Sequence, residues 1–242
     1  MSGILVVHAG LDDGSLWRGT AELLAARYRV EAPVRLQYRP DRGPARTIED
    51  EVAETLAAAE RMGGPVLLVG HSSGGVVALE ALRAAPFAGA VLYEPPVITG
   101  TTLGGDATRR AQAALARGRT ARAMRIFFTE VIKIPAWQAW LGALGVALVP
   151  RLRALAPRQL DDLAALDALG NRLDEYAGIQ APVVLLGGDQ SPAHLGERMD
   201  ALEQVLPDAT RVVMRGQGHT ANHRAPDQLA RIILEHADRV LA

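Results

Sequence analysis

The sequence of 242 residues contains no cysteine, which excludes disulfide bonds, thiolate metal sites and cysteine nucleophiles. Aromatic residues make up only 4% of it, and its basic residues are arginine apart from Lys133. The N-terminal stretch lacks the basic region and the long apolar core of a secretory signal, because its apolar run covers only residues 4–7. No uninterrupted apolar stretch approaches the roughly 20 residues that span a bilayer. These absences predict a cytoplasmic protein that does not act in a membrane.

Neither charge sign dominates the sequence, which has 26 basic and 27 acidic residues. A formal net charge of −1 gives no electrostatic reason to expect a nucleic acid or an anionic membrane as partner. Hydrophobic residues make up 49% of the chain, which is an ordinary value for a globular protein. The length suits one well-buried domain with room for an inserted lid.

Short apolar runs recur along the chain and predict strands that are covered on both faces, because most of them lack clean alternation. They lie at residues 4–7, 28–34, 65–70, 89–93, 181–187 and 210–214. Helical patterns separate them, one beginning at Thr47 with Asp50 three residues later as an approximate capping box, others at 75–85 and 227–240. This alternation predicts an α/β fold with a mostly parallel, doubly wound sheet of about six strands.

Residues 97–178 break this alternation. They contain no convincing strand, but several helical stretches punctuated by Pro135, Pro150 and Pro157. We therefore expect a core domain formed by residues 1–96 and 179–242, with residues 97–178 inserted as a helical cap (lid). The glycine- and threonine-rich segment 98–108 is the expected hinge.

The segment PVLLVGHSSGG, residues 65–75, carries the strongest chemical signal. An apolar strand runs into Gly-His-Ser-Ser-Gly and then into a helix, which is the context that a G-x-S-x-G nucleophile turn requires. Ser72 is at the centre, and Gly70 and Gly74 let neighbouring elements approach closely. The alternative is a small-residue strand–helix turn with a helix-capping serine, and the strand, the helix and the small Gly75 together favour the nucleophile. Ser73 begins the helix, so we expect its backbone N–H, not its hydroxyl, to face the reaction.

A serine nucleophile needs a base, and His219 is the best placed of the six histidines. It follows the last strand and precedes the final helix, in a loop that also contains Gly216 and Gly218. His219 and His223 could also suggest a zinc pair, but no glutamate follows His219 and no third ligand is evident. We therefore expect no metal and no cofactor. His71, His194 and His236 are expected at the turn, in a loop and on a surface helix.

With these motifs in place, the segment Val7-His8-Ala9-Gly10 after the first strand resembles the oxyanion loop of α/β-hydrolases, which usually reads His-Gly-x. The resemblance spans the whole chain, although the two strands that usually begin this fold are absent. It implies an oxyanion hole formed by the N–H groups of Gly10 and Ser73, with Trp17 packing the loop. Asp12 and Asp13 nearby are expected to be solvated turn residues.

Two carboxylates compete for the role of the acid that orients His219. In the usual family pattern the acid follows the strand after the lid, but this position falls on Ser191, and Asp189 lies two residues early. The other candidate is Glu94, in AVLYEPP, which closes the strand after the nucleophile helix. Its two prolines bias Glu94 towards extended geometry. A carboxylate at the end of an apolar run needs a polar partner, and an imidazole would supply it.

Glu94 is favoured because the chain also resembles zearalenone-type lactone hydrolases, which use Ser, His and Glu. The resemblance rests on His71-Ser72-Ser73-Gly74, on Tyr93-Glu94-Pro95-Pro96 and on Gly218-His219. It implies a catalytic triad of Ser72, His219 and Glu94, with Asp189 as the alternative acid.

The segment 126–140 concentrates aromatic residues in a chain that has few. Phe128, Trp137 and Trp140 either form a hydrophobic wall over Ser72 or belong to the core of the lid itself. The first interpretation suits an apolar substrate.

Taken together, these features predict a cofactor-free serine hydrolase that cleaves a carboxylic ester or lactone of an apolar small molecule. Alternatives on the same fold are a thioesterase, a carbon–carbon bond hydrolase, a lyase or a polyketide-tailoring cyclase. A protein that only binds a small molecule is the alternative from another class. We expect a monomer or a homodimer.

Overall fold

The computed structural model describes residues 2–41, 43, 47–100 and 102–242. Within these residues the sheet has six strands, all parallel, in the order β2-β1-β3-β4-β5-β6. They are β1 (Gly3–Val7), β2 (Arg29–Glu31), β3 (Val66–His71), β4 (Gly89–Tyr93), β5 (Val183–Gly188) and β6 (Ala209–Met214). The predicted α/β fold with a parallel, doubly wound sheet is confirmed.

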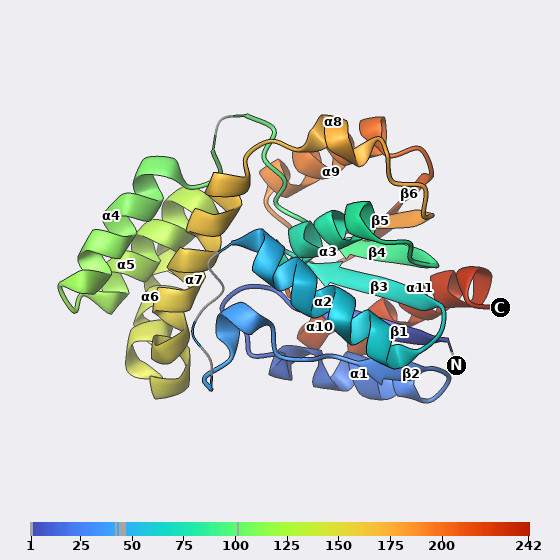
Figure 1. The fold of residues 1–242 in the computed structure, drawn as a ribbon. Helices are drawn as coiled ribbons and strands as arrows, with labels where there is room; N and C mark the ends of the chain where they lie inside the picture. Colours follow the sequence, from blue (N-terminus) through green and yellow to red (C-terminus); the bar gives the residue numbers. More distant parts are fainter. Residues whose placement is uncertain (1, 42, 44–46, 101) are drawn as a thin grey trace.

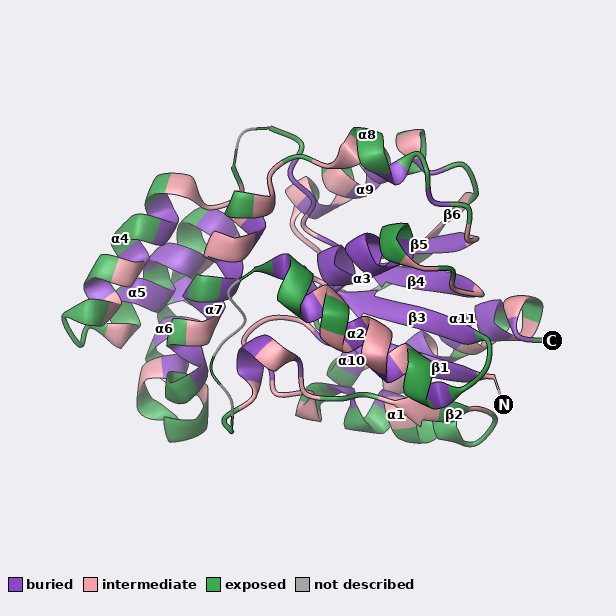
Figure 2. Cartoon of the chain, in the orientation of Figure 1, coloured by how far each residue is buried: buried purple, intermediate pink, exposed green. Residues whose placement is uncertain are grey.

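Helices cover both faces of the sheet, so the central strands are buried throughout (Figures 1 and 2). Alternate strand residues point to opposite faces, and two separate hydrophobic clusters result. One cluster packs against α2 (Ile48–Met62), α3 (Ser73–Ala84) and α9 (Ala193–Val205). The other packs against α1 (Arg18–Ala25) and α11 (Pro226–Val240). A further short helix, α10 (Ala221–Arg224), precedes α11.

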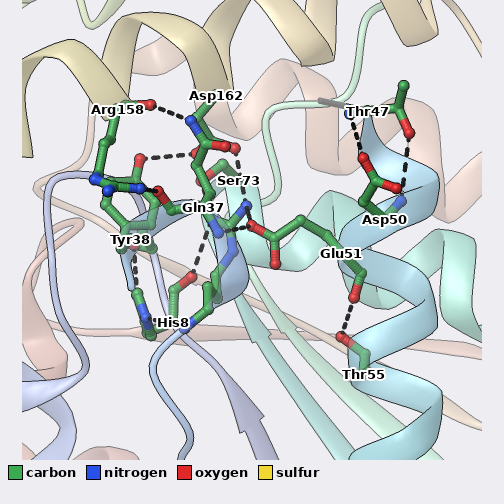
Figure 3. Close-up of polar contacts among 12 residues, drawn as sticks. His8, Gln37, Tyr38, Thr47, Asp50, Glu51, Thr55, Ser73, Arg158 and Asp162 are labelled. Atoms are coloured by element: carbon green, nitrogen blue, oxygen red, sulfur yellow. Dashed lines mark hydrogen bonds and ion pairs between the residues drawn. The ribbon is translucent and has the colours of Figure 1, made fainter. Parts of the chain in front are cut away.

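Helix α2 begins as the sequence predicts. Thr47 accepts a hydrogen bond from the N–H of Asp50 (3.3 Å), and Asp50 accepts one from the N–H of Thr47 (3.2 Å), which completes a capping box (Figure 3). Gly63 ends the helix in the left-handed conformation. Helix α3 begins at Ser73, where the turn motif places its start, and two residues before the helical pattern at 75–85.

Between β4 and β5 the chain forms helices that gather beyond one end of the sheet (Figure 1). They pack around a hydrophobic cluster of their own, which supports the interpretation of this segment as a cap. The main helices are α4 (Gly105–Ala116), α5 (Thr120–Ile126), a π-helical turn η3 (Phe127–Val131), α6 (Ala136–Leu148) and α7 (Pro150–Leu169). The short helix α8 (Leu173–Tyr176) leads back to β5. The predicted hinge includes Thr101, which lies outside the described residues.

Within the part of the chain that the structure describes, no single helix has the length and apolar character to cross a membrane. Helices α6 and α7 meet these criteria only when taken together, and a bend of 112° separates them.

Candidate active site

Ser72 occupies a sharp turn between β3 and α3. Its backbone has φ 53° and ψ −129°, outside the regions that side-chain-bearing residues prefer. The flanking glycines allow this turn to pack tightly. A Cβ on Gly74 would lie 2.3 Å from the carbonyl oxygen of His8, and one on Gly70 would lie 2.6 Å from the Cβ of Ala78. The sequence pattern around Ser72 therefore reflects close backbone approaches on both sides of the turn.

The structure brings Glu94 and His219 together. Glu94 Oε2 lies 2.6 Å from His219 Nδ1, and Glu94 Oε1 accepts a hydrogen bond from the N–H of Gly188 (2.8 Å). The Glu94 side chain is buried, whereas that of His219 is 24% exposed. A carboxylate at Nδ1 leaves Nε2 of the imidazole free to exchange a proton with a serine hydroxyl or a substrate.

The expectation of an extended backbone at Glu94 is wrong. Its φ is 46°, in the left-handed region, instead of the extended geometry that Pro95 was expected to favour. The Glu94 N–H donates to the carbonyl of Leu186 on the neighbouring strand (3.0 Å), which holds the residue at the end of the sheet. The side chain then turns across the strand ends towards Gly188 and His219.

Burial disfavours the ionised form of Glu94, but its neighbours outweigh this effect. The imidazole of His219, the hydroxyl of Ser191 and the amide of Gly188 together lower the pKa of Glu94 below its ordinary value. Ser191 is the position where the family resemblance would have placed the acid. That position therefore lies beside Glu94, even though its side chain carries no charge.

Asp189, the alternative acid, makes a different contact. Its Oδ1 accepts a hydrogen bond from the N–H of Gly216 (2.8 Å), and its own N–H donates to the carbonyl of Met214 (3.2 Å). The side chain is exposed and stabilises the turn after β6. This contact gives Asp189 a loop-capping role.

Two aromatic side chains that the sequence interpretation did not assign to His219 hold its loop. His71 is stacked on Tyr93 with ring centroids 4.5 Å apart, and its Nε2–H donates to the carbonyl of His219 (2.9 Å). The Tyr93 hydroxyl donates to the carbonyl of Gly218 and accepts from the N–H of Ala221 (3.1 Å). Burial lowers the pKa of His71 well below its ordinary value, so this ring stays neutral. The sequence signal for His71 and Tyr93 was their position directly before Ser72 and Glu94.

The loop after β1 passes beneath the cap. A Cβ on Gly10 would lie 2.2 Å from Gln159 Oε1 of α7 and 2.9 Å from the hydroxyl of Tyr38, so the loop backbone lies close against these two side chains. Ser73 is the first residue of α3, and its N–H therefore has no acceptor within the helix. Trp17 is fully buried beside His71, as expected for a residue that packs this loop.

Three polar residues differ from the expected surface roles. Asp12 is buried, and burial raises its pKa to about 6. Asp13 forms an ion pair with Arg151 at the start of α7, and the hydrogen bonds from Arg151 lower the pKa of Asp13 to about 2. His236 is buried and lies 3.2 Å from the carbonyl of Pro182, so it is not a surface residue of its helix.

His8 is a buried neutral histidine with a defined tautomer. Its Nε2 accepts a hydrogen bond from the N–H of Arg35 (2.9 Å), so the proton resides on Nδ1, which donates to the carbonyl of Ala9 (2.8 Å). Burial, assisted by the positive charge of Arg35, lowers the pKa of His8 to about 4.

This shift predicts an acid-sensitive fold. Because the unfolded chain binds a proton at His8 near pH 6.5 and the folded one only near pH 4, the free energy of unfolding should decrease as the pH falls between these values, by roughly 3 kcal/mol for this group. The raised pKa of Asp12 acts in the opposite direction. Urea unfolding at pH 7 and pH 5 measures part of this change, and His8→Gln should reduce it. If the free energy of unfolding depends on pH equally in His8→Gln and wild type, the attribution of this effect to His8 is contradicted.

The cap aromatics do not form one cluster. Phe127 is buried in the cap core, and Phe128 packs beside it, with ring centroids 5.3 Å apart. Trp137 and Trp140 on α6 are 65% and 57% exposed, so the alternative that places them in the core of the cap is wrong. Their contact with a substrate remains a prediction.

Among residues 2–41, 43, 47–100 and 102–242, no group of three or more His, Cys, Asp or Glu side chains is arranged to hold a metal ion. His219 and His223 therefore have no third ligand among these residues.

Comparison with known proteins places this geometry in a family. The sequence profile described as the alpha/beta hydrolase family matches residues 4–232. No curated protein matches the sequence significantly. Among solved structures, an alpha/beta hydrolase from Sphaerobacter thermophilus has a TM-score of 0.84 at 26% identity, with 97% of this chain and 92% of that chain covered.

Two further solved structures show the same fold at lower identity. A thermophilic esterase from Thermogutta terrifontis has a TM-score of 0.74 at 20% identity, with 99% of this chain and 90% of that chain covered. MenH from Staphylococcus aureus has a TM-score of 0.75 at 16% identity, with coverages of 100% and 95%. The fold, the turn at Ser72 and the profile match agree, and the chain belongs to the alpha/beta hydrolase family.

Proposed function

We propose that this protein is a serine hydrolase that cleaves a carboxylic ester or lactone through an acyl-enzyme. The observation that carries the proposal is the contact of Glu94 Oε2 with His219 Nδ1 at 2.6 Å. The serine of the strained strand–helix turn is held near this pair, because the Ser72 N–H donates to the carbonyl of Tyr93, the residue before Glu94 (2.9 Å). A buried carboxylate, an imidazole whose second nitrogen can exchange a proton, and a serine in a strained turn are the three groups that acyl transfer requires.

Each group has one role in the proposed reaction. Ser72 Oγ attacks the carbonyl carbon while His219 Nε2 accepts the hydroxyl proton, and the N–H groups of Gly10 and Ser73 donate to the oxyanion. His219 then returns the proton to the leaving alkoxide, which departs as an alcohol. Water, deprotonated by His219, attacks the acyl-enzyme, and the acid product leaves with Ser72 restored. Glu94 remains ionised and holds the imidazole in the Nδ1–H tautomer.

An apolar substrate is proposed because the cap offers apolar side chains. Trp137 and Trp140 expose large rings on α6, and Phe128 lies on the preceding turn. The aromatic residues of the sequence are few, and several are concentrated in this segment. We propose that these residues contact the acyl or alcohol part of the substrate.

The test is covalent labelling with a fluorophosphonate ester, which phosphonylates an activated serine. Intact-mass and peptide mass spectrometry should find one label, on Ser72, and the labelled protein should no longer hydrolyse p-nitrophenyl butyrate. A label on any other residue would reject the proposed nucleophile. An unlabelled wild-type protein that still binds apolar esters would favour a binding protein. Labelling of Ser72 without turnover of any ester or lactone would favour another reaction on the same fold, such as carbon–carbon bond hydrolysis.

A further inference from the structure

Arg35 lies in a buried network between the cap and the turn at Ser72. Its side chain is only 2% exposed. It forms a bidentate pair with Asp162 of α7, with NH2 at 2.8 Å from Oδ1 and NH1 at 3.2 Å from Oδ2. Glu51 of α2 is a second ion-pair partner, at 3.1 Å. Figure 3 shows Asp162 and Glu51 converging from these two helices.

On the cap side, helix α7 is fixed to the loop that carries Arg35. The Tyr38 hydroxyl donates to Asp162 Oδ2 (2.9 Å). Gln37 Nε2 donates to the carbonyl of Arg158, and Arg158 NH1 donates to the carbonyl of Gln37, both at 2.8 Å (Figure 3). The position of α7 therefore sets the position of Asp162 relative to Arg35.

On the core side, the same guanidinium reaches the proposed oxyanion hole. Arg35 NH1 donates to the hydroxyl of Ser73 (2.8 Å), whose N–H is one proposed oxyanion donor. The backbone N–H of Arg35 donates to His8 Nε2, two residues before Gly10, the other proposed donor. One residue thus contacts the segments of both donors.

Burial of Arg35 disfavours its charge, but Asp162 and Glu51 outweigh this effect and raise its pKa above the ordinary value. Two carboxylates face one guanidinium, so the loss of one carboxylate still leaves a neutral pair. A guanidinium has five donors in a rigid plane, and this plane can hold Asp162 and Ser73 at the same time.

We propose that Arg35 is a positioning residue that links the seating of cap helix α7 to the orientation of the oxyanion hole, through the hydroxyl of Ser73 and the ring of His8. When α7 lies in the position described above, Asp162 fixes the guanidinium of Arg35, and the guanidinium fixes Ser73, the first residue of α3. When α7 is displaced, this constraint on Ser73 is lost. The inference rests on the proposed serine-hydrolase function and concerns its rate, not its substrate.

The test is a double-mutant cycle with Ser73→Ala and Asp162→Asn. Ser73→Ala removes the hydroxyl but keeps the backbone N–H, and Asp162→Asn keeps the shape of the side chain and the Arg35–Glu51 pair. Each variant should label with the fluorophosphonate on the order of 10 to 100 times more slowly than wild type. Because both act through Arg35, the double variant should be no slower than the slower single variant. For p-nitrophenyl butyrate, kcat should fall with KM nearly unchanged.

Glu80→Gln is the matched control, because Glu80 is a buried carboxylate on α3 whose ion pair with Arg83 is remote from Ser73. Thermal unfolding of all variants separates stability from rate. If Asp162→Asn labels at the wild-type rate but has a lowered Tm, the inference is overturned, and the network has a purely structural role. Additive losses in the double variant would also overturn it. If wild type itself fails to label, the proposed function fails instead, so the two failures are distinguishable.

Discussion

Ser72→Ala should lower the turnover of a carboxylic ester by on the order of 10⁵–10⁶-fold and abolish fluorophosphonate labelling. The reason is that the substitution removes the single oxygen that forms the acyl-enzyme, whereas His219, Glu94 and the oxyanion donors remain. The residual rate would come from these groups acting on water. The measurement is kcat for p-nitrophenyl butyrate, with the intact mass recorded after exposure to the label.

Alanine keeps a Cβ at this strained position, so the turn and its contacts with Gly74 should persist. Equal near-UV circular dichroism spectra of wild type and variant serve as the control for folding. An Ser72→Ala protein that retains more than a small fraction of wild-type turnover would exclude Ser72 as the nucleophile. In that case the tight turn would have a structural role, and Ser73 would be the next hydroxyl to test.

Glu94→Gln should lower kcat by about 10³–10⁴-fold, whereas Asp189→Asn should change it by no more than about twofold. Glutamine has the shape of glutamate but no charge. It can present an N–H to His219 Nδ1, which would stabilise the wrong tautomer and place the proton on Nε2, where the base must accept one. The Asp189 side chain accepts hydrogen bonds from Gly216 in the turn after β6 and from its neighbour Gln190.

The pH dependence of kcat/KM supplies a second measurement for Glu94. Since its neighbours lower the pKa of Glu94, the carboxylate should stay ionised throughout the neutral range, and it should not set the acid limb of the wild-type profile. Matched losses of kcat in Glu94→Gln and Asp189→Asn would contradict the assignment of the acid. So would a large loss in Asp189→Asn alone.

The sheet and the turn at Ser72 could be predicted because their signals are local. Apolar runs, glycines and the capping box at Thr47 and Asp50 each specify backbone conformation within a few residues. The end of β4 was harder to predict. Pro95 disfavours compact geometry at Glu94, yet a strand-edge hydrogen bond to Leu186 and the contact with His219 hold it at positive φ.

The cap–core network could not be predicted, because its partners are distant in the sequence. Arg35 and Asp162 are 127 residues apart, and nothing near either residue signals a buried ion pair. The buried states of Asp12 and His236 were missed for a related reason. Polar residues are mostly exposed, and only tertiary packing shows which of them lie inside. The positions of Trp137 and Trp140 likewise depend on which face α6 turns to the other cap helices.

Within the described residues, left-handed backbone at non-glycine positions occurs at Leu11, Ser72, Glu94 and Lys133. Such conformations cost on the order of 1–3 kcal/mol each, in proteins whose whole stability is about 5–15 kcal/mol. Glycine at position 72 or 94 would relieve this cost and remove a proposed catalytic group in the same step. At these two positions a substitution that stabilises the fold would therefore inactivate the protein, whereas Leu11 and Lys133 carry no proposed catalytic group. Thermostability selections of this protein should therefore be coupled to turnover.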